Sequence, residues 1–158
     1  MTKKFEKYFR LFLAFYQTIG GLIGIYFAFS MGLRSYFSHF IIHTIVLFLF
    51  VFSVYCGLIL FKNKVINYKP TLINQYFQSI KILILGYGYE YYTGFICRIG
   101  FTDTPDIKLF FETKLVYSTR AFVYSNDVNY EISLIINIIP VILILLIYKI
   151  QTLKLIKI

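Results

Sequence analysis

Three long apolar runs constrain the fold of this chain more than any other feature. They extend from Leu11 to Ser30, from Phe40 to Phe61 and from Ile132 to Tyr148, and none contains Asp, Glu, Lys or Arg. Each is close to the roughly 20 residues that a helix needs to cross about 30 Å of hydrocarbon. Because the backbone must satisfy its own hydrogen bonds in lipid, these runs predict transmembrane helices.

The composition agrees with a membrane environment. Hydrophobic residues make up 59% of the chain and charged residues 15%, which is typical of integral membrane proteins. The 16 basic residues flank the apolar runs and form no continuous basic surface. We therefore predict contact with anionic lipid headgroups on the cytoplasmic side and no nucleic-acid partner.

A fourth segment, residues 71–92, is ambiguous. Its polar residues fall on one half of a helix at 100° per residue. Such a helix either lies flat at the membrane surface or crosses with its polar side turned into a bundle. The intramembrane polar face predicted in this way is formed by Asn74, Gln75, Gln78 and Lys81.

The basic residues favour a crossing. With four passes, both termini lie on one side, and ten of the 16 Lys and Arg residues fall in residues 1–10, 62–70 and 149–158 on that side. Cytoplasmic segments are enriched in Lys and Arg, so both termini are predicted to be cytoplasmic. A bacterial inner membrane is the expected location, with an organellar inner membrane as the alternative.

The predicted fold class is membrane all-α: a four-helix transmembrane bundle in one domain, residues 1–158. Its spans are expected at about residues 11–30, 40–61, 71–92 and 132–148, with residues 93–131 outside. The outer segment carries turn residues and partly alternating β-branched and aromatic residues, which predict a small extracytoplasmic β-hairpin. We expect its turn near residues 117–119.

Two further sets of residues are candidates for packing or binding. Small residues recur every four positions in the first span, at Gly20, Gly24, Ala28 and Gly32, and such a stripe lets another helix approach closely. His39 and His43 also lie four residues apart, but two histidines fall short of the three protein ligands typical of catalytic zinc. We therefore expect no metal or other cofactor.

Other motifs exclude specific functions. Gly86-Tyr87-Gly88 matches the core of a potassium-channel filter, but Ile84-Leu85 stand where Thr-Val is required. No Ser-His-Asp arrangement or phosphate-binding glycine loop is present in the sequence, so we do not expect an enzyme. Cys56 and Cys97 form no disulfide framework and are expected to be free thiols.

The stretches "YQTIGGLIGIY", "FSVYCGLILFKNK" and "LINQYFQSIKILILGYGYEYYTGF" resemble small multi-pass membrane proteins of Bacteroidetes-type bacteria. The resemblance implies a membrane protein and no particular activity. The function expected is that of a non-enzymatic accessory or structural subunit, which assembles with other membrane subunits. The alternative is a transporter or channel component that uses the Asn74/Gln78/Lys81 face as a polar path.

Overall fold

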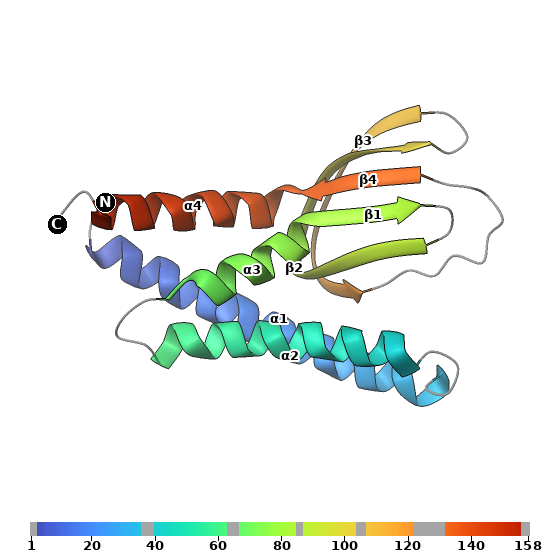
Figure 1. Ribbon diagram of the computed structural model, residues 1–158, viewed down its shortest axis with the longest axis horizontal. Coiled ribbons are helices and arrows are strands. Elements are labelled where there is room, and N and C mark those ends of the chain that lie inside the picture. Colours follow the sequence, from blue (N-terminus) through green and yellow to red (C-terminus); the bar gives the residue numbers. More distant parts are fainter. Residues whose placement is uncertain are drawn as a thin grey trace.

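The computed structural model describes residues 3–35, 40–62, 67–84, 87–103, 107–121 and 132–155. Within them, helices and strands follow one another along the chain as shown in Figure 1. They are α1 (Lys3–Ser35), α2 (Phe40–Lys62), α3 (Lys69–Ser79), β1 (Ile80–Ile84), β2 (Tyr87–Asp103), β3 (Ile107–Ala121), β4 (Ile132–Asn137) and α4 (Ile138–Leu155).

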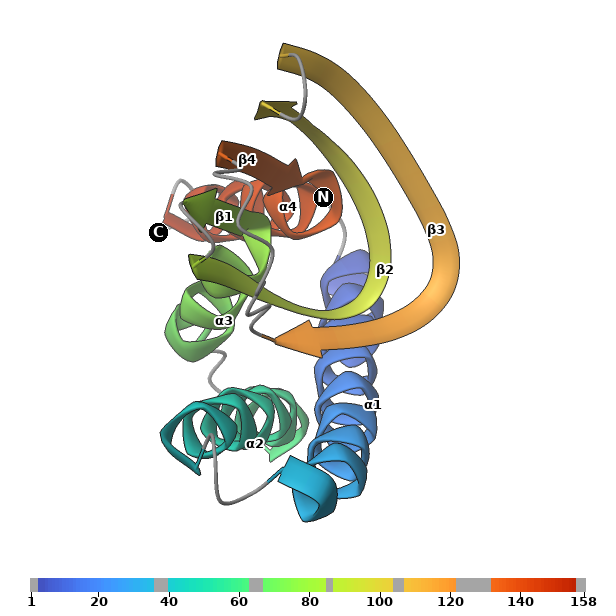
Figure 2. The same ribbon diagram turned by 90° about the vertical axis from the view of Figure 1, so that its right-hand side faces the viewer.

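The first two helices form an antiparallel pair that lies side by side in both views (Figures 1 and 2). Glycine allows their close approach: a Cβ atom at Gly21 would lie 2.7 Å from the carbonyl oxygen of Phe50. Two helical stretches here, Lys4–Ser30 and Thr44–Lys62, are long and apolar enough to cross a membrane. A buried core helix or a signal sequence would pass the same test.

The predicted four-helix transmembrane bundle is wrong. Helix α3 ends at Ser79 and the chain continues as strand β1, while residues 132–137 form strand β4 and the last helix begins at Ile138. The cause lies in short runs rich in isoleucine, whose β-branched side chains pack well on a pleated sheet. An apolar run of this length does not distinguish a strand from a buried helix.

The four strands make an antiparallel sheet in the order β1-β4-β2-β3. Strand β2 is long and curved, so its first residues pair with β1 and its last residues pair with β4, which itself pairs with β1. The backbone pairings of β1, β4 and β2 therefore close into a ring. Figure 2 shows β2 and β3 curving around β1 and β4.

A β-hairpin is present between the third and fourth helices, but its predicted turn is wrong. Ser118 and Thr119 lie inside β3 and pair with Gly94 and Thr93, while the register Asp103↔Ile107 places the reversal after Asp103. The register between β2 and β3 shifts between Gly94 and Ile96, and such an irregularity bends a strand. Gly94 has φ +107°, a conformation that favours glycine, and it lies directly on the Tyr16 ring.

The outer face of the sheet is apolar. The register aligns one row of side chains across all four strands, Ile80–Ile136–Ile99–Phe111, and a second row beside it, Ile82–Leu134–Phe101–Leu109. All eight side chains are exposed, from 38% for Ile82 to 79% for Leu109. We refer to these two sets as the apolar rows.

The opposite, inner face of the sheet carries polar and charged residues. Burial alternates strictly along β4, with Ser133, Ile135 and Asn137 buried. Asn137 also precedes α4, where its Oδ1 accepts hydrogen bonds from the N–H groups of Ile139 and Cys97. One side chain thus joins the helix start to β2.

The helices share an apolar core on the other side of α3. Leu13 of α1, Leu72 of α3 and Ile147 of α4 belong to one buried cluster, together with Tyr68 just before α3. The start of α1 and the end of α4 lie at the same end of the molecule in Figure 1, away from the sheet. Helix α3 packs against α2, α4 and strand β2.

Candidate functional site: a polar interior between α3 and the sheet

The polar residues of α3 point inward. Asn74 and Gln75 are 0% exposed and Gln78 is 2% exposed, whereas Ile73 and Phe77 on the other side of the helix are 48% and 45% exposed. This distribution is the reverse of the usual one for a surface helix, which turns its polar side to water. The interior of the protein is therefore where α3 places its hydrogen-bonding groups.

Asn74 connects three helices and the sheet. Its Nδ2 donates to Ser53 Oγ of α2 at 3.2 Å, and the Ser53 hydroxyl donates to the carbonyl oxygen of Gln17 in α1 at 3.1 Å. Tyr91 Oη of β2 lies 3.1 Å from Asn74 Oδ1 and 2.9 Å from the carbonyl oxygen of Leu49. Its single proton is shared between these two acceptors.

Gln78 makes the next connection, one helical turn further on. Its Oε1 accepts hydrogen bonds from both the N–H and the hydroxyl of Thr93, each at 3.2 Å. Thr93 is 1% exposed and belongs to the curved middle of β2. Asn74 and Gln78 together fasten α3 to the α1–α2 pair and to β2.

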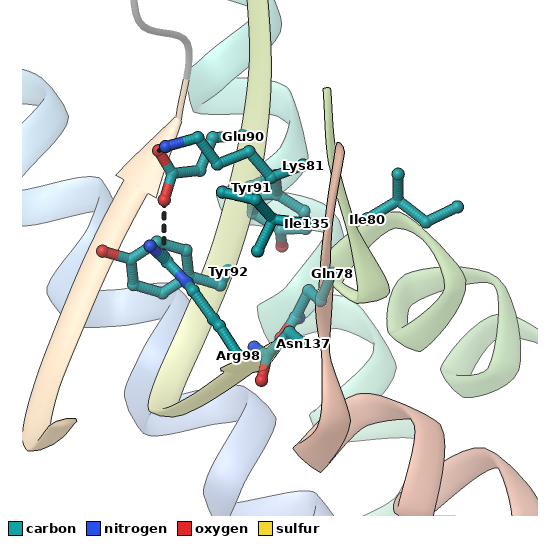
Figure 3. A pocket seen from close by; sticks show the side chains of 9 residues that line it. All are labelled: Gln78, Ile80, Lys81, Glu90, Tyr91, Tyr92, Arg98, Ile135 and Asn137. Carbon is teal, nitrogen blue, oxygen red and sulfur yellow. Dashed lines mark hydrogen bonds and ion pairs between the residues drawn. The ribbon is translucent and has the colours of Figure 1, made fainter. Parts of the chain in front are cut away.

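A cluster of four charged residues follows on the inner face of the sheet. Glu90, which is 2% exposed, receives Lys81 Nζ at 3.3 Å from its Oε2 and is hydrogen-bonded through Oε1 to Arg98 (Figure 3). Arg98 also lies 3.6 Å from Glu112 Oε2 and stacks over the Tyr92 ring at 4.6 Å. Two cations and two carboxylates give the charge cluster no net formal charge.

A small cavity separates this charge cluster from α3. Gln78, Tyr92 and Asn137 line it together with Lys81, Glu90 and Arg98, and Figure 3 shows these side chains converging from α3, β1, β2 and β4. Its volume is about 10 Å³. That is room for about one water molecule, so the cavity does not hold an organic substrate in this conformation.

Several buried amides retain hydrogen-bonding capacity. The side-chain amides of Gln17 and Gln75, and Nε2 of Gln78, have no hydrogen-bond partner among the described residues. An unsatisfied buried polar group costs about 1–3 kcal/mol. Apolar side chains at these positions of α1 and α3 would avoid this cost, so the buried amides lower the stability of the fold.

The charged and polar groups do not make a recognisable catalytic or metal centre. Within the described parts of the chain, no three His, Cys, Asp or Glu residues are close enough to share a metal ion. Glu90 is held between two cations and so is poorly suited to act as a general base. Cys56 and Cys97 are free thiols, and Cys56 is buried.

The other predicted site residues have different positions. Gly24 meets the Phe50 ring, and Ala28 packs against the cluster of Val46, Leu49 and Phe50, so part of the small-residue stripe faces α2. Gly20 is buried. The surroundings of Gly32, the side chain of His43 and all of His39 lie outside what the structure describes, and so their predicted roles remain predictions.

Sequence reasoning missed the residues that pair with the polar face. Glu90 was not part of the predicted polar face and Arg98 was predicted in the outer segment, yet both point into the interior. Lys81 was predicted as a member of the polar face, and its partner is Glu90. The one available signal was that Glu90 interrupts a tyrosine run, and it does not reveal a partner in space.

Comparisons with models of protein families, with curated proteins and with solved structures find no match for this chain.

Proposed function

We propose that this chain is a small polytopic membrane protein without enzymatic activity, an accessory or structural subunit of a membrane complex in a bacterial inner membrane. Its α1–α2 pair spans the bilayer, and both termini lie on the cytoplasmic side. Its polar interior holds the sheet against the helices, and its apolar exterior meets lipid and other membrane subunits.

The reversed polarity of α3 carries this proposal. A protein in water buries apolar side chains and exposes polar ones, and it rarely buries three amides of one helix while exposing Ile73 and Phe77 beside them. Hydrocarbon favours the opposite arrangement, because polar groups within a bilayer turn toward the interior of the protein. The large exposed side chains of α1 and α2, such as Leu22 at 54% and Phe48 at 67%, agree with it.

The basic residues support the orientation. Lys4 and Lys7 lie at the start of α1, Lys62 ends α2, and Lys149 lies near the end of α4. These positions share the end of the molecule that carries both described chain ends (Figure 1). A membrane surface with anionic lipids on the cytoplasmic side attracts such a cluster.

A transporter or channel component is the second candidate. It is favoured by the cavity beside Lys81, whose side chain is 23% exposed, and by the Gln78 Nε2 that has no hydrogen-bond partner among the described residues. The accessory reading explains more, because Lys81 is already paired with Glu90 and the cavity has room for one water only.

Replacement of Lys81 by leucine separates the two. Purified protein in liposomes is expected to leave proton and ion flux at the level of protein-free liposomes, and Lys81→Leu is expected to lower only the yield of folded protein. Lys69→Leu, which removes an exposed lysine at the start of α3, is the matched control. If the wild type conducts and Lys81→Leu abolishes the flux at normal yield, the second candidate is correct.

The accessory role is tested by assembly. Purification in mild detergent is expected to retain a membrane partner in fixed stoichiometry, and that stoichiometry should survive replacement of the exposed Lys69. A protein that runs as a single lipid-bound chain under all such conditions, with no partner, would remove the accessory part of the proposal.

A further inference from the structure

We propose that the apolar rows lie against the acyl chains of the bilayer, so that α3 with β1, and β4 with α4, each cross the hydrocarbon as half helix and half strand. This inference rests on the proposed membrane function and goes beyond it, because the membrane function requires only that α1 and α2 span. It places the sheet within the membrane and not in the water outside it.

The lengths of the elements support these mixed crossings. Helix α3 has 11 residues and covers about 16 Å at 1.5 Å per residue, which is half of the hydrocarbon thickness of about 30 Å. Strand β1 adds five residues, or about 16 Å at 3.3 Å per residue. Neither element reaches across alone, and the two together do.

The combined length of β4 and α4 also matches the thickness of the hydrocarbon. The part of α4 before its first basic residue, Lys149, runs from Ile138 to Tyr148 and covers about 16 Å. Strand β4 contributes six residues, or about 20 Å. If Lys149 lies at the cytoplasmic headgroups, Ile136 lies about 23 Å and Leu134 about 30 Å further along this path, within the roughly 30 Å of hydrocarbon.

The exposed apolar side chains continue without a break through each crossing. On the outward path they run from Ile73 and Phe77 of α3 into Ile80 and Ile82 of β1. On the return path the strand positions Leu134 and Ile136 are followed by exposed Ile142 and Leu145 of α4. A helix that ended at a water surface would not be followed by an apolar outer face.

The distribution of charge identifies the occupant as lipid. The charged side chains Lys81, Glu90 and Arg98 of β1 and β2 face inward, and together with Glu112 of β3 their formal charges sum to zero. An antiparallel sheet with one face in water shows the reverse pattern, polar outside and apolar inside. A polar interior inside an apolar outer surface is the arrangement of strands in a bilayer.

The backbone of the inserted strands is also satisfied. Strands β1 and β4 each pair on both edges, because the curved β2 closes the ring around them. Hydrocarbon tolerates strands only where their backbone groups are paired. Among the described strands β3 pairs with β2 alone, so we place its other edge where headgroups can supply hydrogen bonds.

The absence of tryptophan from the sequence makes a direct test possible. Single tryptophans are introduced into the full chain by Phe101→Trp and Leu134→Trp in the apolar rows, with Phe48→Trp on α2 and Lys69→Trp at the basic end as controls. Each protein is reconstituted with lipids that carry bromine on their acyl chains, and its fluorescence is also titrated with acrylamide in the aqueous phase. Two sites in the rows guard against misfolding of either variant.

We expect Phe101→Trp and Leu134→Trp to be quenched by brominated lipid as strongly as Phe48→Trp, with Lys69→Trp quenched mainly by acrylamide. If Phe48→Trp is quenched by lipid but the two row positions are quenched by acrylamide, the sheet lies in water and the inference fails while the membrane function stands. If the row positions are shielded from both quenchers, a second copy or another protein covers them, and the inference is equally overturned. If Phe48→Trp escapes lipid quenching, the membrane function itself is wrong.

Discussion

Replacement of Glu90 by glutamine is the most direct probe of the polar interior. The carboxylate is 2% exposed, accepts a hydrogen bond from Arg98 and forms an ion pair with Lys81. Glutamine has nearly the same shape, but it removes the negative charge and turns an amide N–H₂ toward one of two cationic donors. Arg98 and Lys81 then remain in the interior without their shared counter-ion.

The magnitude follows from the exposure of each partner. Removal of one member of a buried ion pair costs about 3–5 kcal/mol. The value here should be near the lower limit, about 3 kcal/mol, because Lys81 is 23% exposed and Arg98 keeps Glu112 at 3.6 Å. By contrast, Lys81→Met should cost about 1 kcal/mol, because a partly exposed pair contributes little.

The free energy of unfolding is measured by titrating detergent-solubilised protein with sodium dodecyl sulfate. Circular dichroism and thiol labelling of the buried Cys56, in a Cys97→Ser background, report secondary and tertiary structure. Lys81→Met should add little further loss in the Glu90→Gln background, because the unpaired ammonium is then removed. If Glu90→Gln costs less than about 1 kcal/mol, the carboxylate is hydrated and the closed polar interior is wrong.

The remaining predictions concern three other places. Gly94→Ala should destabilise by about 3 kcal/mol in the same titration, since alanine is strained at φ +107° and its Cβ would enter the Tyr16 ring; wild-type stability would contradict this. Burial raises the pKa of Tyr68 to about 12, with the Glu6 carboxylate adding to the shift and Arg10 opposing it. Its contribution to stability should therefore be complete below pH about 10 and be lost as pH rises toward 12. When unfolding by sodium dodecyl sulfate is repeated at these pH values, Tyr68→Phe should lack this loss of stability. An aqueous maleimide should label Cys97 of the folded protein faster than the wholly buried Cys56, and equal rates would show that α2 is not packed as described.

Local patterns in the sequence were sufficient for the first two helices. The uncharged runs from Leu11 and Phe40 lie within α1 and α2, because a long apolar run has few alternatives to a helix. The helical spacing of Asn74 and Gln78 also places both on one side of α3, and both are buried. These features depend on residues that are neighbours along the chain.

The switch from helix to strand at Ile80 and again at Ile138 could not be predicted in this way. Five or six apolar residues fit either structure, and the choice is made by pairing between β1 and β4, which are far apart in sequence. The partners of the polar face were missed for the same reason, since Ser53 and Tyr91 meet Asn74 only in the folded protein. Charge counting assigned Arg98 to the outer segment because it treats every charge as solvated.

The closed ring of strands has a consequence for how the protein is made. In the proposed membrane arrangement, the α1–α2 pair can enter the bilayer as soon as it leaves the ribosome, because each helix satisfies its own backbone. Strand β1 cannot, because its second edge waits for β4, which is synthesised after residue 131. Until then Asn74 and Gln78 lack part of their bonding network and Lys81 has no settled counter-ion in the bilayer. Maturation in that arrangement is thus expected to occur in two stages, an early helical hairpin followed by entry of α3 to α4 as a unit once β4 has been synthesised.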